Sequence, residues 1–136
     1  MQVKVNQIDR FKFEVQARSH SVICDQPIEN GGEDAGMTPP ELLLASLGGC
    51  AEFYAVQYLR TRKLDDSGVE VTVSAEKLFQ PARLGNFRIH VTSPTELTPE
   101  QMEGLRRSVH HCLIHNTLLS APAVEIDFAV GVHALS

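Results

Sequence analysis

The strongest constraint on this chain is one apolar stretch, "TPPELLLASLGGC", at residues 38–50. Thr38 and Glu41 have the spacing of a capping box, and Pro39 stands between them where a missing N–H does no harm. The residues that follow are apolar on nearly every side, which is typical of a helix enclosed by other elements. We therefore predict a long buried helix from Pro39 to about Lys63.

Two glycines interrupt this helix directly before a cysteine. Gly48 and Gly49 each cost about 1 kcal/mol relative to alanine in a helix interior, and Cys50 follows them. Close packing of another backbone would explain the glycines, and so would an open path to the Cys50 sulfur. The sequence leaves both explanations open.

Length and composition indicate one soluble domain. The chain has 136 residues and a formal net charge of -5, so we expect a single domain over residues 1–136 that binds neither nucleic acid nor a membrane surface. The first residues alternate polar and apolar, unlike a signal peptide, and the apolar stretch 42–51 is too short to cross a bilayer. We expect a cytoplasmic protein, in which cysteines are reduced thiols or core residues.

Periodicity elsewhere predicts an α+β fold with mostly antiparallel strands. Apolar and polar residues alternate near residues 3–5, 11–17, 69–75, 87–91 and 124–130, as in half-buried strands, and we expect a further short strand at 20–24. Thr98 and Gln101 repeat the helix-start pattern, and an apolar stripe from Met102 to Leu113 predicts a second, amphipathic helix. The expected order is strands, a long helix, two strands, a helix and a closing strand. Residues 25–37 form a polar, glycine-rich loop of a length that is often functional.

The positions of two cysteines on the predicted helices suggest different reactivities. Cys50 lies three turns into its helix, beyond the reach of the helix dipole, so a nearby cation is needed to favour its thiolate. Cys112 is predicted in the last turn of the second helix, where the dipole disfavours a thiolate. If the two act together, Cys50 is the better attacking thiol and Cys112 the better resolving thiol. The alternative is that both are small core residues.

The segments "DQPIENGGEDAGMTPPELLLASLGGC" and "HHCLIHNTL" resemble the OsmC/Ohr family. The shared pattern is a D-x-P, a glycine-rich loop, a P-x-E-L helix that leads to a reactive cysteine, and a late C-x-x-H-N-T-L, and the expected order of elements agrees. The resemblance implies an OsmC-like fold and a thiol-dependent peroxidase that reduces organic hydroperoxides. It also implies an intertwined homodimer with its sites at the subunit interface, reduced by a thiol such as a dihydrolipoyl group.

The resemblance also implies roles for particular residues. Cys50 matches the peroxidatic cysteine and Cys112 the resolving one. Glu41 lies one position after the usual glutamate of the peroxidases, where it is also the third residue of the capping box. Arg10 lies near the position of an activating arginine but without the usual glycines before it, and Arg18 is a second candidate. Both arginines are equally compatible with a solvated surface.

Two other functions remain open. Cys112 and three neighbouring histidines (His110, His111 and His115) form the densest group of metal ligands, and His111 and His115 are four apart, so a zinc site is conceivable. We nevertheless predict no metal and no bound cofactor. A non-enzymatic dimer could instead bind a small hydrophobic ligand in an apolar interface pocket.

The long helix itself favours assembly. One chain offers too few apolar faces to cover it, and the patch formed by Ala45, Gly48 and Gly49 is expected to stay uncovered. A second copy related by a two-fold axis would cover that patch. We therefore expect an obligate homodimer with Cys50 near its interface.

Overall fold

The computed structural model describes residues 1–131 and has the predicted α+β architecture, with three helices and two antiparallel sheets. The first sheet is a meander of β1 (Lys4–Asp9), β2 (Lys12–Ala17) and β3 (His20–Cys24). A short 3-10 helix, η1 (Ile28–Asn30), follows in the loop that leads to α1 (Pro39–Thr61). The chain continues through the hairpin of β4 (Glu70–Leu78) and β5 (Arg83–Thr92) to α2 (Pro99–Val109) and α3 (Leu113–Leu119).

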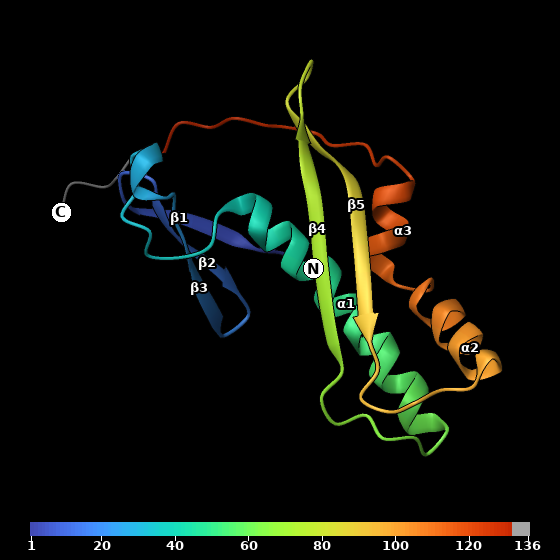
Figure 1. The fold of residues 1–136 in the computed structure, drawn as a ribbon. Coiled ribbons are helices and arrows are strands. Elements are labelled where there is room, and N and C mark those ends of the chain that lie inside the picture. Colours follow the sequence, from blue (N-terminus) through green and yellow to red (C-terminus); the bar gives the residue numbers. More distant parts are fainter. Residues whose placement is uncertain (132–136) are drawn as a thin grey trace.

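The central helix α1 begins as the sequence predicts. The Thr38 hydroxyl accepts a hydrogen bond from the Glu41 N–H, and the Glu41 carboxylate accepts one from the Thr38 N–H. Two N–H groups that the first turn would leave unpaired are thus satisfied. The helix packs against the β4–β5 hairpin and both later helices (Figure 1).

The core lies along one face of α1. The buried residues of this face are spaced three or four apart, as one helix face requires: Leu47, Ala51, Ala55, Tyr58 and Leu59. Gly104 of α2 lies so close to the Tyr58 ring that a Cβ there would overlap it. The opposite face of α1 is open in the single chain, and Phe53 is 60% exposed.

The β4–β5 hairpin covers α1 with one face only. Residues of β4 alternate between half-buried and exposed, and Val71 and Val91 pack against the core from opposite positions of the ladder. The strands extend further than the alternation predicted, because Arg83–Asn86 belong to β5 and not to the connection. The hairpin therefore supplies a long apolar wall beside the helix.

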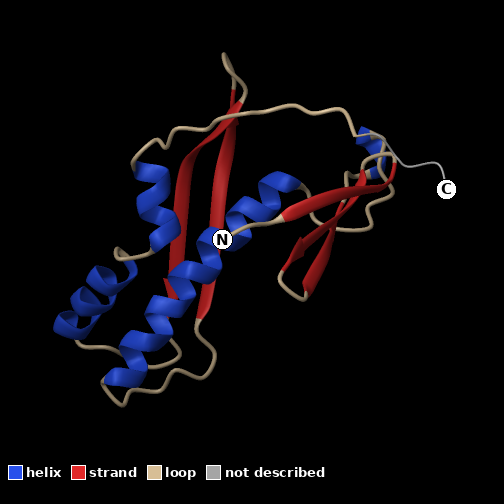
Figure 2. Cartoon of the chain, turned by 180° about the vertical axis from the view of Figure 1, so that it is seen from behind, coloured by secondary structure: helices blue, strands red, loops and turns tan. Residues whose placement is uncertain are grey.

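The three-stranded meander stands apart from the hairpin and the helices in both views (Figures 1 and 2). Its outer residues include apolar side chains such as Val5, Phe11 and Val22 that are exposed in the single chain. The meander continues into the α1 loop through Cys24, which pairs with Met37 in an isolated bridge. Cys24 is buried, and burial followed by the nearby charge of Asp25 raises the pKa of its thiol.

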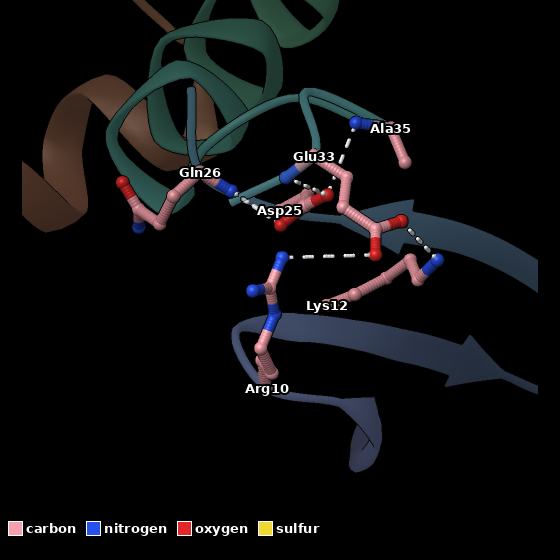
Figure 3. Close-up of polar contacts among 6 residues, drawn as sticks. All are labelled: Arg10, Lys12, Asp25, Gln26, Glu33 and Ala35. Carbon is pink, nitrogen blue, oxygen red and sulfur yellow. Dashed lines mark hydrogen bonds and ion pairs between the residues drawn. The ribbon is translucent and has the colours of Figure 1, made fainter. Parts of the chain in front are cut away.

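Asp25 organises the loop before α1. Its side chain is 1% exposed and accepts hydrogen bonds from the N–H groups of Gln26, Glu33 and Ala35 at 2.7–3.2 Å (Figure 3). Burial alone would raise the pKa of Asp25, but these three donors, helped by the charge of Lys12, hold it below its ordinary value. The predicted glycine-rich loop is therefore a structured support for the start of α1.

The end of the chain differs from the prediction in two ways. The second helix does not run to Leu113: α2 ends at Val109, a turn follows, and α3 starts at Leu113 with Cys112 as its N-cap. The predicted closing strand at 124–130 is not a strand, because no strand of the described chain lies alongside to pair with it. Instead, this segment runs extended from α3 toward the meander (Figure 1).

Candidate active site

The break between α2 and α3 brings Cys112 to Cys50. Cys112 is fully buried, at 0% exposure, and Cys50 on α1 is half-buried. The two thiols lie close enough for each to shift the pKa of the other. Both cysteines are free thiols, so this is the reduced form of the pair.

Hydrogen-bond donors favour the thiolate of Cys50. Burial alone would raise its pKa, but the Cys112 thiol and the N–H groups of Ile114 and Leu113 donate to its sulfur. Together these donors lower the pKa of Cys50 below its ordinary value. The N–H groups come from the first turn of α3, where no earlier carbonyl of the helix can accept them.

Cys112 has the opposite shift. Burial raises its pKa first, and its hydrogen bond to Cys50 raises it further, while the His115 N–H lowers it in part. We predicted a disfavoured thiolate from the C-terminal end of a helix dipole, and that reason is wrong because Cys112 caps the N-terminus of α3. The direction is the same, but desolvation and the partner sulfur cause it.

Arginine is not among the groups that shift the pKa of Cys50 in the described part of the chain. Arg10 lies in the turn between β1 and β2, where its guanidinium is 3.8 Å from the Glu33 carboxylate (Figure 3). Arg18 lies in the next turn, between β2 and β3. In the described single chain, the groups that lower the pKa of Cys50 thus include N–H groups of α3 and neither arginine.

Glu41 acts as the capping residue of α1. Its carboxylate accepts hydrogen bonds from both the N–H and the hydroxyl of Thr38 at 2.9 Å, which lowers its pKa. It also lines a hollow between α1 and β4, together with Gly48, Gly49 and Glu52. The cap explains its position without any further role.

The glycines before Cys50 have different surroundings. A Cβ on Gly48 would lie 3.1 Å from a methyl group of Val73 on β4, so close packing accounts for this glycine. A Cβ on Gly49 would have no neighbour within 4 Å among the described residues. Close packing therefore explains Gly48, although its neighbour is a side chain and not a backbone. Gly49 faces open space in the single chain.

The histidines do not form the helical pair that would suggest zinc. His111 lies in the turn before Cys112 and His115 lies in α3, so the two do not share a helix face. His110 and His115 stack edge to face with ring centroids 5.4 Å apart. No group of three or more metal-ligating side chains occurs within residues 1–131.

The structure also has an apolar groove of about 900 Å³, and neither Cys50 nor Cys112 is among its lining residues. Its walls come from α1, β5, α2 and α3 and include Leu47, Ile89, Leu105 and Val109. Its polar lining residues are Arg106, His110 and His115. His115 links the groove to the thiols, because its own N–H donates a 3.4 Å hydrogen bond to the Cys112 sulfur.

The sequence analysis missed the contribution of the first turn of α3. Leu113 and Ile114 act through backbone groups, which no side-chain motif reveals. A signal was present nevertheless: C-L-I-H repeats the spacing of T-P-P-E and T-P-E-Q at the other two helix starts. It was overlooked because cysteine is an unusual helix cap.

The chain is an α+β protein built around a central helix that carries Cys50. The chain belongs to the OsmC-like family, whose family model matches residues 31–127. This membership confirms the resemblance drawn from the sequence and indicates a soluble fold. No relative among the curated proteins matches the sequence.

Solved structures of similar fold come from several bacteria. A Psychrobacter arcticus protein named for osmotic stress and detoxification response is 20% identical, with a TM-score of 0.78 over 86% of this chain and 87% of that one. An organic hydroperoxide resistance protein OsmC from Legionella pneumophila is 20% identical, with a TM-score of 0.66 over 88% and 90%. An OsmC-like protein from Mycoplasma pneumoniae is 16% identical, with a TM-score of 0.72 over 88% and 87%. At these identities the likeness establishes the fold.

Proposed function

We propose that this protein is a thiol-dependent peroxidase that reduces organic hydroperoxides. The observation that carries the proposal is the Cys50–Cys112 pair, whose pKa values are shifted in opposite directions and whose Cys112 contacts His115, a lining residue of the apolar groove. The Cys50 thiolate attacks the O–O bond, releases the alcohol and becomes a sulfenic acid. Cys112 then attacks that sulfur, forms a disulfide and releases water.

The groove favours apolar hydroperoxides. Its volume of about 900 Å³ and its mostly apolar walls are typical of sites for small organic molecules. The Legionella structural neighbour is named an organic hydroperoxide resistance protein, which is consistent with this substrate class. Both electrons come from the thiols, so the proposal needs no bound cofactor.

An external thiol must return the disulfide to the reduced pair. A dihydrolipoyl group is the candidate that the family resemblance suggests, and a small dithiol can replace it in an assay. Reduced Cys50 and Cys112 fit the cytoplasm, where free thiols persist. We therefore retain a cytoplasmic location as part of the proposal.

We also propose that the active form is a homodimer. The open face of α1, the exposed apolar residues of the meander and the unpaired segment 124–130 together leave much apolar surface in water. Such surface is unusual for a monomer, and an obligate dimer commonly buries more than about 2,000 Å² in total. A second copy packed on α1 would lie close to Cys50.

In the dimer, the second copy would also supply a positively charged side chain near Cys50, which the described single chain does not bring there. Arg10 and Arg18 lie in the two turns of the meander, which stands apart from the hairpin and the helices (Figure 2). We propose that one of them further favours the Cys50 thiolate in the dimer. Glu41 would then orient that arginine in addition to capping α1.

The catalytic proposal is tested by replacing each thiol. We expect Cys50→Ser to abolish consumption of cumene hydroperoxide with a dithiol reductant. Cys112→Ser should retain one oxidation per chain and then over-oxidise at Cys50, because no resolving thiol captures the sulfenic acid. Peroxide consumption and mass spectrometry of the intact chain measure both outcomes, and equal turnover by wild type and Cys50→Ser would refute the proposal.

The second candidate is a non-enzymatic dimer that binds a small hydrophobic ligand, which the size of the groove favours. Thiol counting separates the two functions. An enzyme loses free thiols in proportion to the hydroperoxide added, whereas a binding protein keeps them.

A further inference from the structure

Three helices of this chain start with the same arrangement. In α1 and α2 the threonine N-cap accepts from the N–H three residues on, and the side chain there, Glu41 or Gln101, accepts from the N-cap N–H. In α3, Cys112 is the N-cap and its sulfur accepts from the His115 N–H at 3.4 Å. His115 therefore occupies the position of Glu41 and Gln101.

The reciprocal bond is missing in α3. The Cys112 N–H already donates to the Val109 carbonyl at 3.1 Å, so it is not available to the His115 ring. Nδ1 of His115 is left buried and without a hydrogen-bond partner, and it is the one such side-chain atom among residues 1–131. Unpaired buried polar atoms are rare in native proteins and call for an explanation.

The resolving step offers a reason for a free acceptor on His115, the residue whose N–H contacts the Cys112 sulfur. The thiolate is the attacking form of a cysteine, and Cys112 is fully buried with a raised pKa. In the reduced pair its proton is held against Cys50. Once Cys50 has become a sulfenic acid, that proton must leave Cys112 for the disulfide to form.

On the basis of the proposed peroxidase function, we propose that Nδ1 of His115 is the base of the resolving step. It accepts the proton of Cys112 as the sulfur attacks Cys50. The S–S bond forms, the S–O bond of the sulfenic acid breaks, and the proton passes to the leaving hydroxide to give water. The only oxidant is the hydroperoxide that formed the sulfenic acid, so electrons and atoms balance.

The surroundings of the ring suit this role. Arg106 and His110, at the end of α2, are the other charged or titratable residues that line the groove with His115. α1 contributes the Cys50 thiol on the side of the cysteine pair, and the lining from β5 is apolar. The groove lining contains no carboxylate, so no acidic side chain there is placed to act as the base instead.

The test is a single turnover of reduced protein with one equivalent of cumene hydroperoxide in wild type and His115→Asn. Dimedone trapping follows the sulfenic acid on Cys50, and a maleimide quench with mass spectrometry follows the disulfide. We expect Cys50 oxidation within about twofold of wild type and disulfide formation about 100-fold slower at pH 7, the usual contribution of a general base. The variant's rate should rise about tenfold per pH unit, as the thiolate fraction of Cys112 does, and wild type should respond less steeply.

His111→Asn is the matched control, because His111 is exposed, adjoins Cys112 and does not line the groove. It should keep the wild-type rates. His115→Gln repeats the measurement if the asparagine variant melts early. Absence of Cys50 oxidation in wild type would overturn the peroxidase function and this inference with it. If Cys50 oxidises normally, a wild-type disulfide rate in His115→Asn, or the same slowing at every pH, would overturn the role of His115 alone.

Discussion

The loop before α1 and the segment after α3 contrast sharply. Residues 25–37 look irregular in sequence, yet the Asp25 carboxylate and the Gln26 and Pro27 carbonyls accept six of their backbone N–H groups. Residues 121–131 contain the alternation of a strand, yet they make no backbone hydrogen bond within the described chain. Phe128 is 92% exposed there. The first region is complete in one chain, whereas the second has the pattern of a strand that pairs elsewhere.

The largest expected effect is on the segment after α3. Ile126→Asp with Phe128→Asp should convert the proposed dimer to monomer at micromolar concentration, as light scattering would show. Burial of each side chain contributes ~2 kcal/mol, so losing both from each subunit weakens association by more than about a thousandfold. Glu125→Ser with Asp127→Ser, at the alternate positions, is the control. A double aspartate variant that stays dimeric would show that the segment lies outside the interface.

The loop before α1 should respond through stability. Asp25→Asn removes the charge that three N–H groups require, and we expect the melting temperature to fall by about 10 °C. Glu29→Ala, in exposed η1, should change it little.

The same carboxylate predicts a pH dependence. Its pKa is depressed in the folded chain, so its stabilisation is fully present above the unfolded-chain value of about 3.9 and is lost as the pH falls through the lower folded value. Wild type should therefore lose stability below about pH 4 more steeply than Asp25→Asn. Parallel pH profiles of the two proteins would show that Asp25 does not hold the loop in this way.

The smallest expected effect is at Gly49, on the open face of α1. In the isolated chain alanine has room there and should stabilise the helix by ~1 kcal/mol. If a second copy packs on this face, the added methyl group should instead weaken dimerisation, by about tenfold in dissociation constant. Sedimentation or light scattering of Gly49→Ala, with Ser46→Ala as control, shows whether the substitution weakens dimerisation. Tighter folding with unchanged dimerisation would place the interface elsewhere.

The sequence predicts those parts of the fold that local chemistry determines. The T-P-x-E and T-P-x-Q boxes mark the starts of α1 and α2 because their bonds span only three residues. The break at Cys112 escaped prediction, because no glycine or proline marks it and the apolar stripe continues across it at helical spacing. The lack of pairing at residues 124–130 in the described chain escaped prediction, because a strand depends on a neighbour that alternation does not identify.

The same distinction applies to the candidate site. The family pattern identifies Cys50 and Cys112, but their environment depends on backbone groups of Leu113 and Ile114 that the break exposes. An arginine was expected because Cys50 lies three turns into its helix, beyond the reach of the helix dipole. The α3 donors were missed because the helix boundary was misplaced, and the activating arginine stays a prediction for the assembled protein.

The third cysteine, Cys24, is buried and can report local unfolding of the protein. Cys24 is shielded at the junction of β3 and the α1 loop, and its raised pKa keeps it in the unreactive thiol form. An alkylating reagent would modify it only when that junction opens, so its labelling rate reports local opening of the loop. Oxidation of the active thiols and opening of the scaffold can therefore be followed in one sample, by mass, without an introduced probe.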